Sequence, residues 1–327
     1  MEPLLQVLNL NVGFHSGTTR RNAASQVSFQ IYPGEVLALV GESGAGKSVT
    51  ALSLLRLLPK NGYATGDVLY HGQNLLTMSD SELDRIRGAE ISMIFQDIMN
   101  SLNPVFTIGR QIAEPMRTHL GLSKEQAFSR TISLLEKTGI RNARQVAFQF
   151  PHQLSGGMRQ RAMIAMALAC NPRLLIADEP TTALDVTIQL QIMRLLRQLR
   201  TEMNMALLLI THDLGIVAET ADRILVMYAG QCIESGTAEA VLTQPLHPYT
   251  QALLRAVPPI RGAASQRLYA IPGSVPETYD TLDGCRFRAR CPYAPDCTSA
   301  LHDPGMLELA PQHLSRCPYL AGGNRHD

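Results

Sequence analysis

One stretch of the sequence, residues 41–48, has the residue types and spacing that bind a polyphosphate. Its glycines, Gly41, Gly44 and Gly46, let backbone N–H groups turn inward around an anion. If a helix follows this loop, its positive end points at the same place. The pattern therefore predicts a phosphate-binding loop.

The sequence on either side of this loop supplies the strand and the helix that it needs. Residues 36–40 form an apolar run typical of a buried strand, and residues 49–58 are compatible with a helix. We expect Lys47 to reach the β- and γ-phosphates and the Ser48 hydroxyl to bind Mg²⁺. The chain is therefore predicted to bind a nucleoside triphosphate.

Two carboxylates, Asp178 and Glu179, end a second apolar run. An apolar strand disfavours carboxylates unless they meet a cation or water at its carboxyl end, where a parallel α/β sheet binds its ligand. We expect Asp178 to hold Mg²⁺, directly or through water, and Glu179 to polarise the attacking water. His212 follows the next apolar run, residues 206–211, and could contact the γ-phosphate, although for a lone histidine a structural role is the better explanation.

The six cysteines fall into two groups. Cys170 and Cys232 stand alone in apolar surroundings, as small buried hydrophobic residues do. The other four lie near the C-terminal end: Cys285, Cys291, Cys297 and Cys317. The N-terminus has no secretory signal, so a reducing compartment is expected, and it favours metal binding over disulfides.

The kind of metal site that these four cysteines form stays open on the residues alone. Structural zinc usually has C-x₂₋₄-C pairs, which are missing here. An iron–sulfur cluster accepts wider loops, and the Cys-Pro steps at Cys291 and Cys317 resemble ferredoxin-type ligation. Nearby arginines, among them Arg286 and Arg290, could offset thiolate charge or form a solvated basic face. Iron–sulfur, zinc and neither all remain alternatives.

Composition limits the class of protein. With 327 residues, 45% of them hydrophobic, the chain can bury a substantial core in two domains or in one with additions. No apolar run approaches the roughly 20 residues that span a bilayer. The formal net charge of +1 provides no general attraction for nucleic acid or acidic lipid.

The remaining elements follow from hydrophobic periodicity. Residues 4–10 and 24–32 are predicted as strands, with a turn over residues 12–15 that would expose Phe14. Residues 97–158 contain no comparable strand and are expected to form an inserted helical subdomain. At its end, Ser155 is a good N-cap for a new helix.

These motifs together resemble the ATP-binding subunit of an ABC transporter over residues 4–242. In chain order they match Walker A, Q-loop, signature, Walker B, D-loop and H-loop: residues 41–48, Gln96, residues 154–160, residues 174–179, residues 183–185 and His212. The tail, with His247-Pro-Tyr-Thr250 and the cysteine cluster, is similar to the dipeptide, oligopeptide and nickel import subfamily. The fold implied is a P-loop α/β nucleotide-binding domain with an inserted helical subdomain and a small cysteine-rich extension, residues 243–327.

The resemblance implies a role for each motif residue. Phe14 would stack on adenine, Gln96 would touch Mg²⁺ or water and sense the transmembrane subunit, and His212 would hold the γ-phosphate and the attacking water. Asp185 would cross the dimer interface. The resemblance also implies an ATP-binding set in the loop, Gly41, Ser43, Gly44, Ala45, Gly46, Lys47, Ser48 and Val49, and one for the ATP of the opposite subunit, Ser155, Gly156 and Gly157.

The resemblance also implies cofactors and partners. It assigns a [4Fe–4S] cluster to Cys285, Cys291, Cys297 and Cys317. A second ABC ATPase, two transmembrane permease subunits and an external substrate-binding protein would complete a peptide importer, with this chain at the cytoplasmic face of the bacterial inner membrane. A nickel or metallophore importer is the alternative cargo class. A soluble ABC ATPase acting on DNA or ribosomes fits less well, because the helical insertion is short and the charge near neutral.

Overall fold

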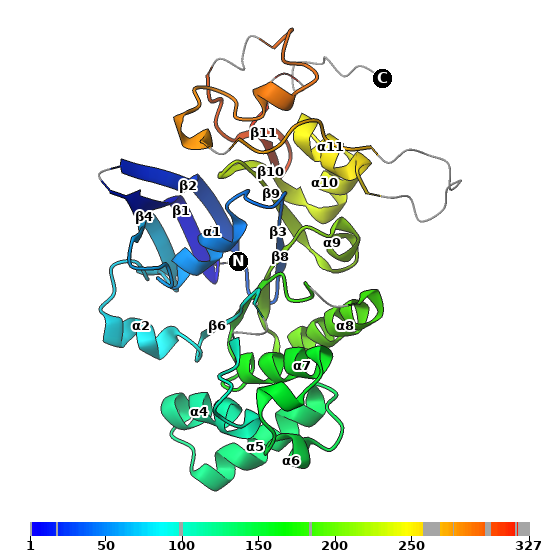
Figure 1. The fold of residues 1–327 in the computed structure, drawn as a ribbon. Helices are drawn as coiled ribbons and strands as arrows, with labels where there is room; N and C mark the ends of the chain where they lie inside the picture. Colours follow the sequence, from blue (N-terminus) through cyan, green and yellow to red (C-terminus); the bar gives the residue numbers. More distant parts are fainter. Residues whose placement is uncertain are drawn as a thin grey trace. The chain divides into compact units, whose positions relative to one another are not determined.

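The computed structural model describes residues 2–17, 19–97, 101–182, 185–257, 269–276, 278–297, 302–317 and 319. The chain forms two compact units. Unit 1 comprises residues 1–31, 36–76 and 211–327, and unit 2 comprises residues 32–35 and 77–210. Figure 1 shows the elements of both units, labelled in chain order.

Unit 1 contains an antiparallel sheet in the order β2-β1-β4-β5. Its strands are β1 (Leu5–Ser16), β2 (Thr19–Ile31), β4 (Gly62–Tyr70) and β5 (Gln73–Asn74). Val27, Phe29 and Ile31 of β2 are buried and alternate with less buried neighbours, so this strand has the expected period of two.

The turn predicted over residues 12–15 is wrong. These residues continue β1, and Val12 pairs with Ala24 of β2. Gly13 is a site of close backbone approach: a Cβ there would collide with the carbonyl oxygen of Arg21 and the ring of Tyr63. The glycine is therefore explained by packing between strands and not by a turn.

A second group of strands in unit 1 lies in the order β11-β12-β10-β9-β3. The strands are β3 (Val36–Val40), β9 (Arg223–Tyr228), β10 (Gln231–Thr237), β11 (Leu307–Ala310) and β12 (His313–Ser315). β3 and β9 are parallel, and β9 and β10 form an antiparallel hairpin through Ala229 and Gly230. Both turn residues have positive φ, as a tight hairpin turn requires.

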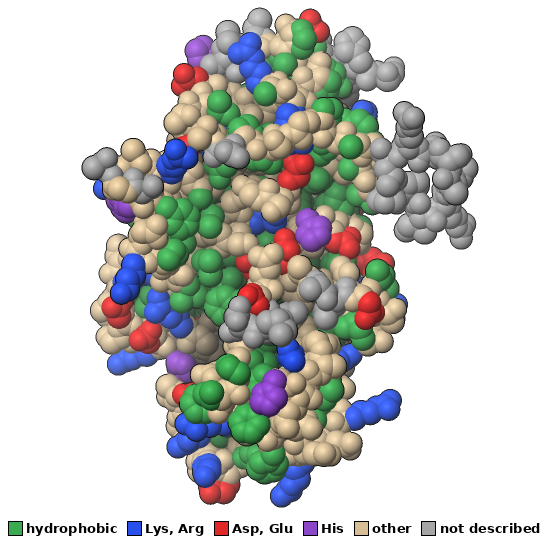
Figure 2. Space-filling model, viewed as in Figure 1, with side chains coloured by type: hydrophobic (Ala, Val, Ile, Leu, Met, Phe, Trp, Pro, Cys, Tyr) green, Lys and Arg blue, Asp and Glu red, His purple; other side chains and the backbone are tan. Residues whose placement is uncertain are grey.

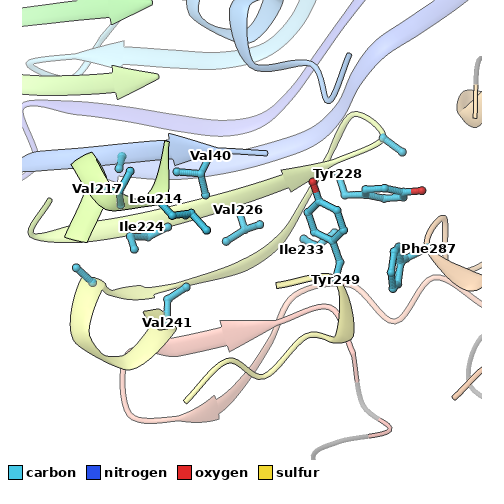
Figure 3. Packing of buried hydrophobic residues seen from close by; sticks show 13 residues of the cluster. Val40, Leu214, Val217, Ile224, Val226, Tyr228, Ile233, Val241, Tyr249 and Phe287 are labelled. Carbon is cyan, nitrogen blue, oxygen red and sulfur yellow. The ribbon is translucent and has the colours of Figure 1, made fainter. Parts of the chain in front are cut away.

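Helices and C-terminal segments complete unit 1. They are α1 (Lys47–Leu54), α9 (Leu214–Thr220), α10 (Ala238–Thr243), α11 (Pro248–Arg255), and the 3₁₀ turns η2 (Tyr279–Thr281) and η3 (Arg288–Arg290). A buried cluster joins Val40 and Val226 of the strands to Tyr249 of α11 and to Phe287 (Figure 3). Phe287 belongs to the C-terminal region, so that region shares the core of unit 1.

Unit 2 combines parallel strands with helices. The strands lie in the order β8-β7-β6, with β6 (Ile91–Ile94), β7 (Leu174–Asp178) and β8 (Ala206–Thr211). The helical elements are α2 (Asp80–Ile86), α4 (Ile108–Leu120), α5 (Lys124–Lys137), α6 (Ala143–Val146), η1 (Pro151–Gln153), α7 (Gly156–Ala167) and α8 (Val186–Met203). Within the described ranges, none of the chain's helices has both the length and the apolar character needed to cross a membrane.

Candidate nucleotide-binding and hydrolysis site

The phosphate-binding loop of unit 1 runs from the buried strand β3 into α1, as the sequence predicts. Its backbone requires glycine at two points. A Cβ at Gly41 would collide with the carbonyl oxygen of Met227, and one at Gly46 would lie 2.6 Å from the carbonyl oxygen of Ala23. Gly46 has φ +96°, which L-residues rarely adopt. The loop is thus shaped by backbone packing against β2 and β9.

Lys47 lies across the loop that precedes it. Its side chain is buried, and Nζ donates hydrogen bonds to the carbonyl oxygens of Gly41 (2.9 Å) and Glu42 (3.0 Å). The Thr50 hydroxyl donates to the carbonyl oxygen of Gly46 (2.8 Å) and ties α1 to the loop. The two acceptors of the Lys47 ammonium, the carbonyl oxygens of Gly41 and Glu42, are both neutral.

In unit 2 the structure brings together Gln96 and Glu179, the residues predicted to act on water. Glu179 follows β7 with φ 45°, and its Oε2 accepts hydrogen bonds from Gln96 Nε2 (3.1 Å) and from the Thr182 hydroxyl (2.8 Å). These two donors orient the carboxylate, and its oxygens can still accept a hydrogen bond from another donor. Asp178, at the end of β7, is only 3% exposed, and a buried carboxylate favours a cationic partner.

Thr182 was not identified from the sequence. It lies three residues after Glu179, and the intervening Pro180 is held by a hydrogen bond from the buried side chain of Gln160 to its carbonyl oxygen. The spacing in the sequence could have indicated this contact, because a hydroxyl three positions after a carboxylate can reach back to it.

The helix predicted at the signature is present as α7. Ser155 is its N-cap, and its hydroxyl accepts a hydrogen bond from Met158 N–H (3.4 Å). Ser155 and Gly156 are exposed, so the first N–H groups of a twelve-residue helix face outward. Such a helix end attracts an anionic oxygen.

The other predicted residues lie in separate places. Asp185 is exposed and caps α8, accepting from Ile188 N–H (2.9 Å), whereas positions 183 and 184 of the predicted D-loop lie outside the described residues. His212 is exposed at the end of β8, directly before the N-cap of α9. Phe14 is half-buried in β1.

The predicted cysteine site is a small closed cavity of unit 1. Cys285, Cys291, Cys297 and Cys317 all line it, and its volume is about 20 Å³. All six cysteines of the chain are free thiols. Burial raises the pKa of Cys291 to about 11 and also raises that of Cys285. Over the described part of the chain, no three His, Cys, Asp or Glu side chains are arranged to hold a metal ion.

Comparison with known proteins identifies the family. Residues 24–182 match the ABC transporter family, and residues 233–297 match the C-terminal region of oligopeptide/dipeptide transporters. The dipeptide transport ATP-binding protein DppD of Escherichia coli (strain K12) is 49% identical over 317 residues, which cover 97% of this chain and 96% of DppD. The chain belongs to the ABC transporter ATP-binding family.

Other ABC proteins agree with this assignment. A protein of Brucella abortus (strain 2308) described as a peptide import ATP-binding protein is 51% identical, over 97% of this chain and 95% of its own length. The solved ABC cassette MJ0796, a dimer bound to ADP and Pi, has a TM-score of 0.64 and 28% identity and covers 72% of this chain. CbiO1 of Clostridium perfringens has a TM-score of 0.63 and 27% identity over 75% of this chain. The fold is that of a P-loop ABC ATPase.

The packing of Gly46 gives a first prediction. Gly46→Ala combines a positive φ with a clash against the Ala23 carbonyl, so we expect a loss of roughly 2 kcal/mol or more in stability and weakened ATP binding. Gly17→Ala is the matched control, because Gly17 has φ +61° but nothing within 4 Å of its Cβ. It should cost about 1 kcal/mol and leave ATP affinity unchanged. Thermal unfolding and fluorescent-nucleotide titration of both variants measure the difference, and equal effects would contradict the packing argument.

Proposed function

We propose that this chain is the ATP-hydrolysing subunit that energises the import of dipeptides or oligopeptides by an ABC transporter. The observation that carries the proposal is the likeness to DppD along nearly the whole chain, through the nucleotide-binding part and the C-terminal region alike. A nickel or metallophore cargo remains the alternative to be tested. The subunit itself would be peripheral, at the cytoplasmic face of the inner membrane, with a substrate-binding protein delivering cargo on the other side.

The loop and the strand ends would divide the work of hydrolysis. Backbone N–H groups of residues 43–49 and the Lys47 ammonium would bind the phosphates, and Phe14 would stack on adenine. Ser48, Gln96 and Asp178 would hold Mg²⁺, which supplies charge neutralisation for phosphoryl transfer. Asp178 is buried, and the hydroxyl, amide and carboxylate oxygens of these three residues are the kind of ligand that binds Mg²⁺.

Glu179 would orient and deprotonate the attacking water, with His212 holding the γ-phosphate. The support is geometric: the carboxylate of Glu179 is already fixed by Gln96 and Thr182. Preorganised acceptors of this kind do not have to reorient at the moment of reaction.

The exposed start of α7 would bind the ATP held by a second ABC subunit. Ser155, Gly156 and Gly157 would face its γ-phosphate, and Asp185 would lie at the interface. This arrangement is proposed because a helix N-terminus open to solvent suits an anion from another chain and because the related cassette MJ0796 is dimeric.

The assignment of Glu179 predicts a separation of binding from turnover. Glu179→Gln keeps the shape and the hydrogen-bond capacity but removes the base, so ATP should still bind while kcat falls by at least about 100-fold. Lys47→Ala should instead abolish ATP binding, because it removes the cation of the loop. Nucleotide titration and phosphate release distinguish the two variants, and hydrolysis by Glu179→Gln at the wild-type rate would refute the role of Glu179.

The permease subunits would dock on the helical part of unit 2. A hollow of about 560 Å³ lies there, and its lining includes Phe128 and the 64% exposed Phe148. Charged residues of both signs also line it: Arg110, Arg117, Lys124, Glu114 and Glu125. Figure 2 shows hydrophobic side chains at the surface of this helical part, with lysine, arginine and acidic side chains around them. An exposed aromatic side chain bordered by charged groups suits a protein partner that offers an apolar side chain and polar groups around it.

The four clustered cysteines would bind iron as a [4Fe–4S] cluster. The support is that all four cysteine side chains line one cavity. Protein purified anaerobically should therefore contain iron. It should also absorb broadly at about 400 nm, where thiolate-to-iron charge transfer is expected. The Cys291→Ser variant should lose both signals. Zinc without iron would identify the alternative site, and absence of any metal would refute metal binding.

The function as a whole is tested with the native membrane partners. The tagged full-length chain, recovered with its permease subunits and reconstituted in vesicles, should show ATPase activity that rises when a peptide-loaded binding protein is added. A matched preparation with Glu179→Gln serves as the control for contaminating ATPases. Stimulation by nickel or a metal chelate instead of peptide would assign the alternative cargo, and recovery with ribosomes or DNA but without permease subunits would overturn the proposal.

A further inference from the structure

Glu42, the second residue of the phosphate-binding loop, forms an ion pair with the C-terminal region of unit 1. Arg290 of η3 donates from both terminal nitrogens to the Glu42 carboxylate, at 2.7 Å and 3.1 Å. The side chain of Arg290 is only 4% exposed and that of Glu42 is 29% exposed. A bidentate pair with one partner buried is stronger and better oriented than an ordinary surface salt bridge.

Glu42 is also held through its backbone. Its N–H donates to the hydroxyl of the buried Tyr249 in α11 (2.9 Å), and its carbonyl oxygen accepts from Lys47 Nζ (3.0 Å). The residue is therefore fixed at its amide, its carbonyl and its carboxylate. Two of these three contacts come from residues beyond position 242.

Contacts other than the one with Glu42 also hold the Arg290 side chain in place. Its Nε donates to the carbonyl oxygen of Pro272 (2.7 Å), and its guanidinium lies 5.7 Å from the ring centre of Tyr228. Tyr228 in turn packs against Tyr249 and Phe287, with ring centres 4.7 Å and 5.2 Å away (Figure 3). A guanidinium held in this way loses little further entropy when it binds a carboxylate.

A second arginine of the same segment contacts the neighbouring turn. Arg286 donates to the carbonyl oxygen of Ala229 and to the Ser25 hydroxyl (3.2 Å for the latter). The next residue, Gly230, donates its N–H to the carbonyl oxygen of Ala45 in the loop (3.0 Å). The segment from Cys285 to Cys291 thus reaches the phosphate-binding loop by two routes.

We propose that Arg290 is a positioning residue for ATP binding: it neutralises Glu42 and keeps its carboxylate away from Lys47 and from the phosphates. The Lys47 ammonium already donates to the backbone of Glu42. Without Arg290, the freed carboxylate would pair with that ammonium or repel the polyphosphate, and either effect lowers affinity for ATP. The inference rests on the proposed binding of ATP at this loop.

The test is a double-mutant cycle in the full-length chain. Arg290→Met should weaken ATP binding by about 5- to 10-fold, as expected when one partner of a partly buried pair is removed. Adding Glu42→Gln to that variant should restore the affinity to within about 2-fold, because the uncompensated charge is then gone. Arg290→Lys should bind ATP with intermediate affinity. Arg288→Met is the matched control, since Arg288 lies exposed in the same 3₁₀ turn, and it should bind ATP as the wild type does.

Restoration by the second substitution decides the result, because a purely structural role of Arg290 would leave the double variant as weak as Arg290→Met. That outcome, or unchanged affinity in Arg290→Met, would overturn the proposal. If Arg290→Met does not fold, the same comparison is made with Arg290→Lys alone and combined with Glu42→Gln. Lys47→Ala tests ATP binding at the loop independently: if it retains ATP affinity, ATP binds elsewhere and the failure lies with the proposed function.

Discussion

The structure of unit 1 depends on a close approach between three backbone segments. Gly230 N–H donates to the Ala45 carbonyl (3.0 Å), Ser25 N–H donates to the Gly230 carbonyl (2.7 Å), and Gly46 lies against the carbonyl of Ala23. These backbone contacts join β2, the phosphate-binding loop and the β9–β10 turn, and the Arg286 side chain adds a further link between β2 and the turn. The eight-residue loop is therefore held by segments that lie far apart in the sequence, from Ala23 to Gly230.

Sequence reasoning predicted the local parts of the site well. The loop, the strand before it and the helix after it occupy adjacent positions, and glycine spacing with apolar periodicity describes such contacts directly. The hydrogen bond between Gln96 and Glu179 was not predicted, because 83 positions separate these residues and no local pattern connects them. The prediction of a turn at residues 12–15 was wrong because Gly13 is needed for close contact with Tyr63. No local sequence pattern identifies that contact.

The contacts of the C-terminal region could not be predicted for the same physical reason. Arg290 and Glu42 are 248 positions apart, and each looks like an ordinary surface charge in its own sequence context. What makes the pair specific is the burial of the guanidinium beside the ring of Tyr228, which is a property of the packed core and not of the segment. Arginines near clustered cysteines suggested thiolate neutralisation, whereas two of them instead contact the nucleotide-binding part.

An appended region with little apolar material usually adds little to the domain that carries it, but here the connection is unusually direct. Cys285 and Cys291 bracket the segment that carries Arg286 and Arg290. The buried Phe287 between them fixes the segment from inside the core. One short piece of chain therefore contacts both the cysteine region and the phosphate-binding loop.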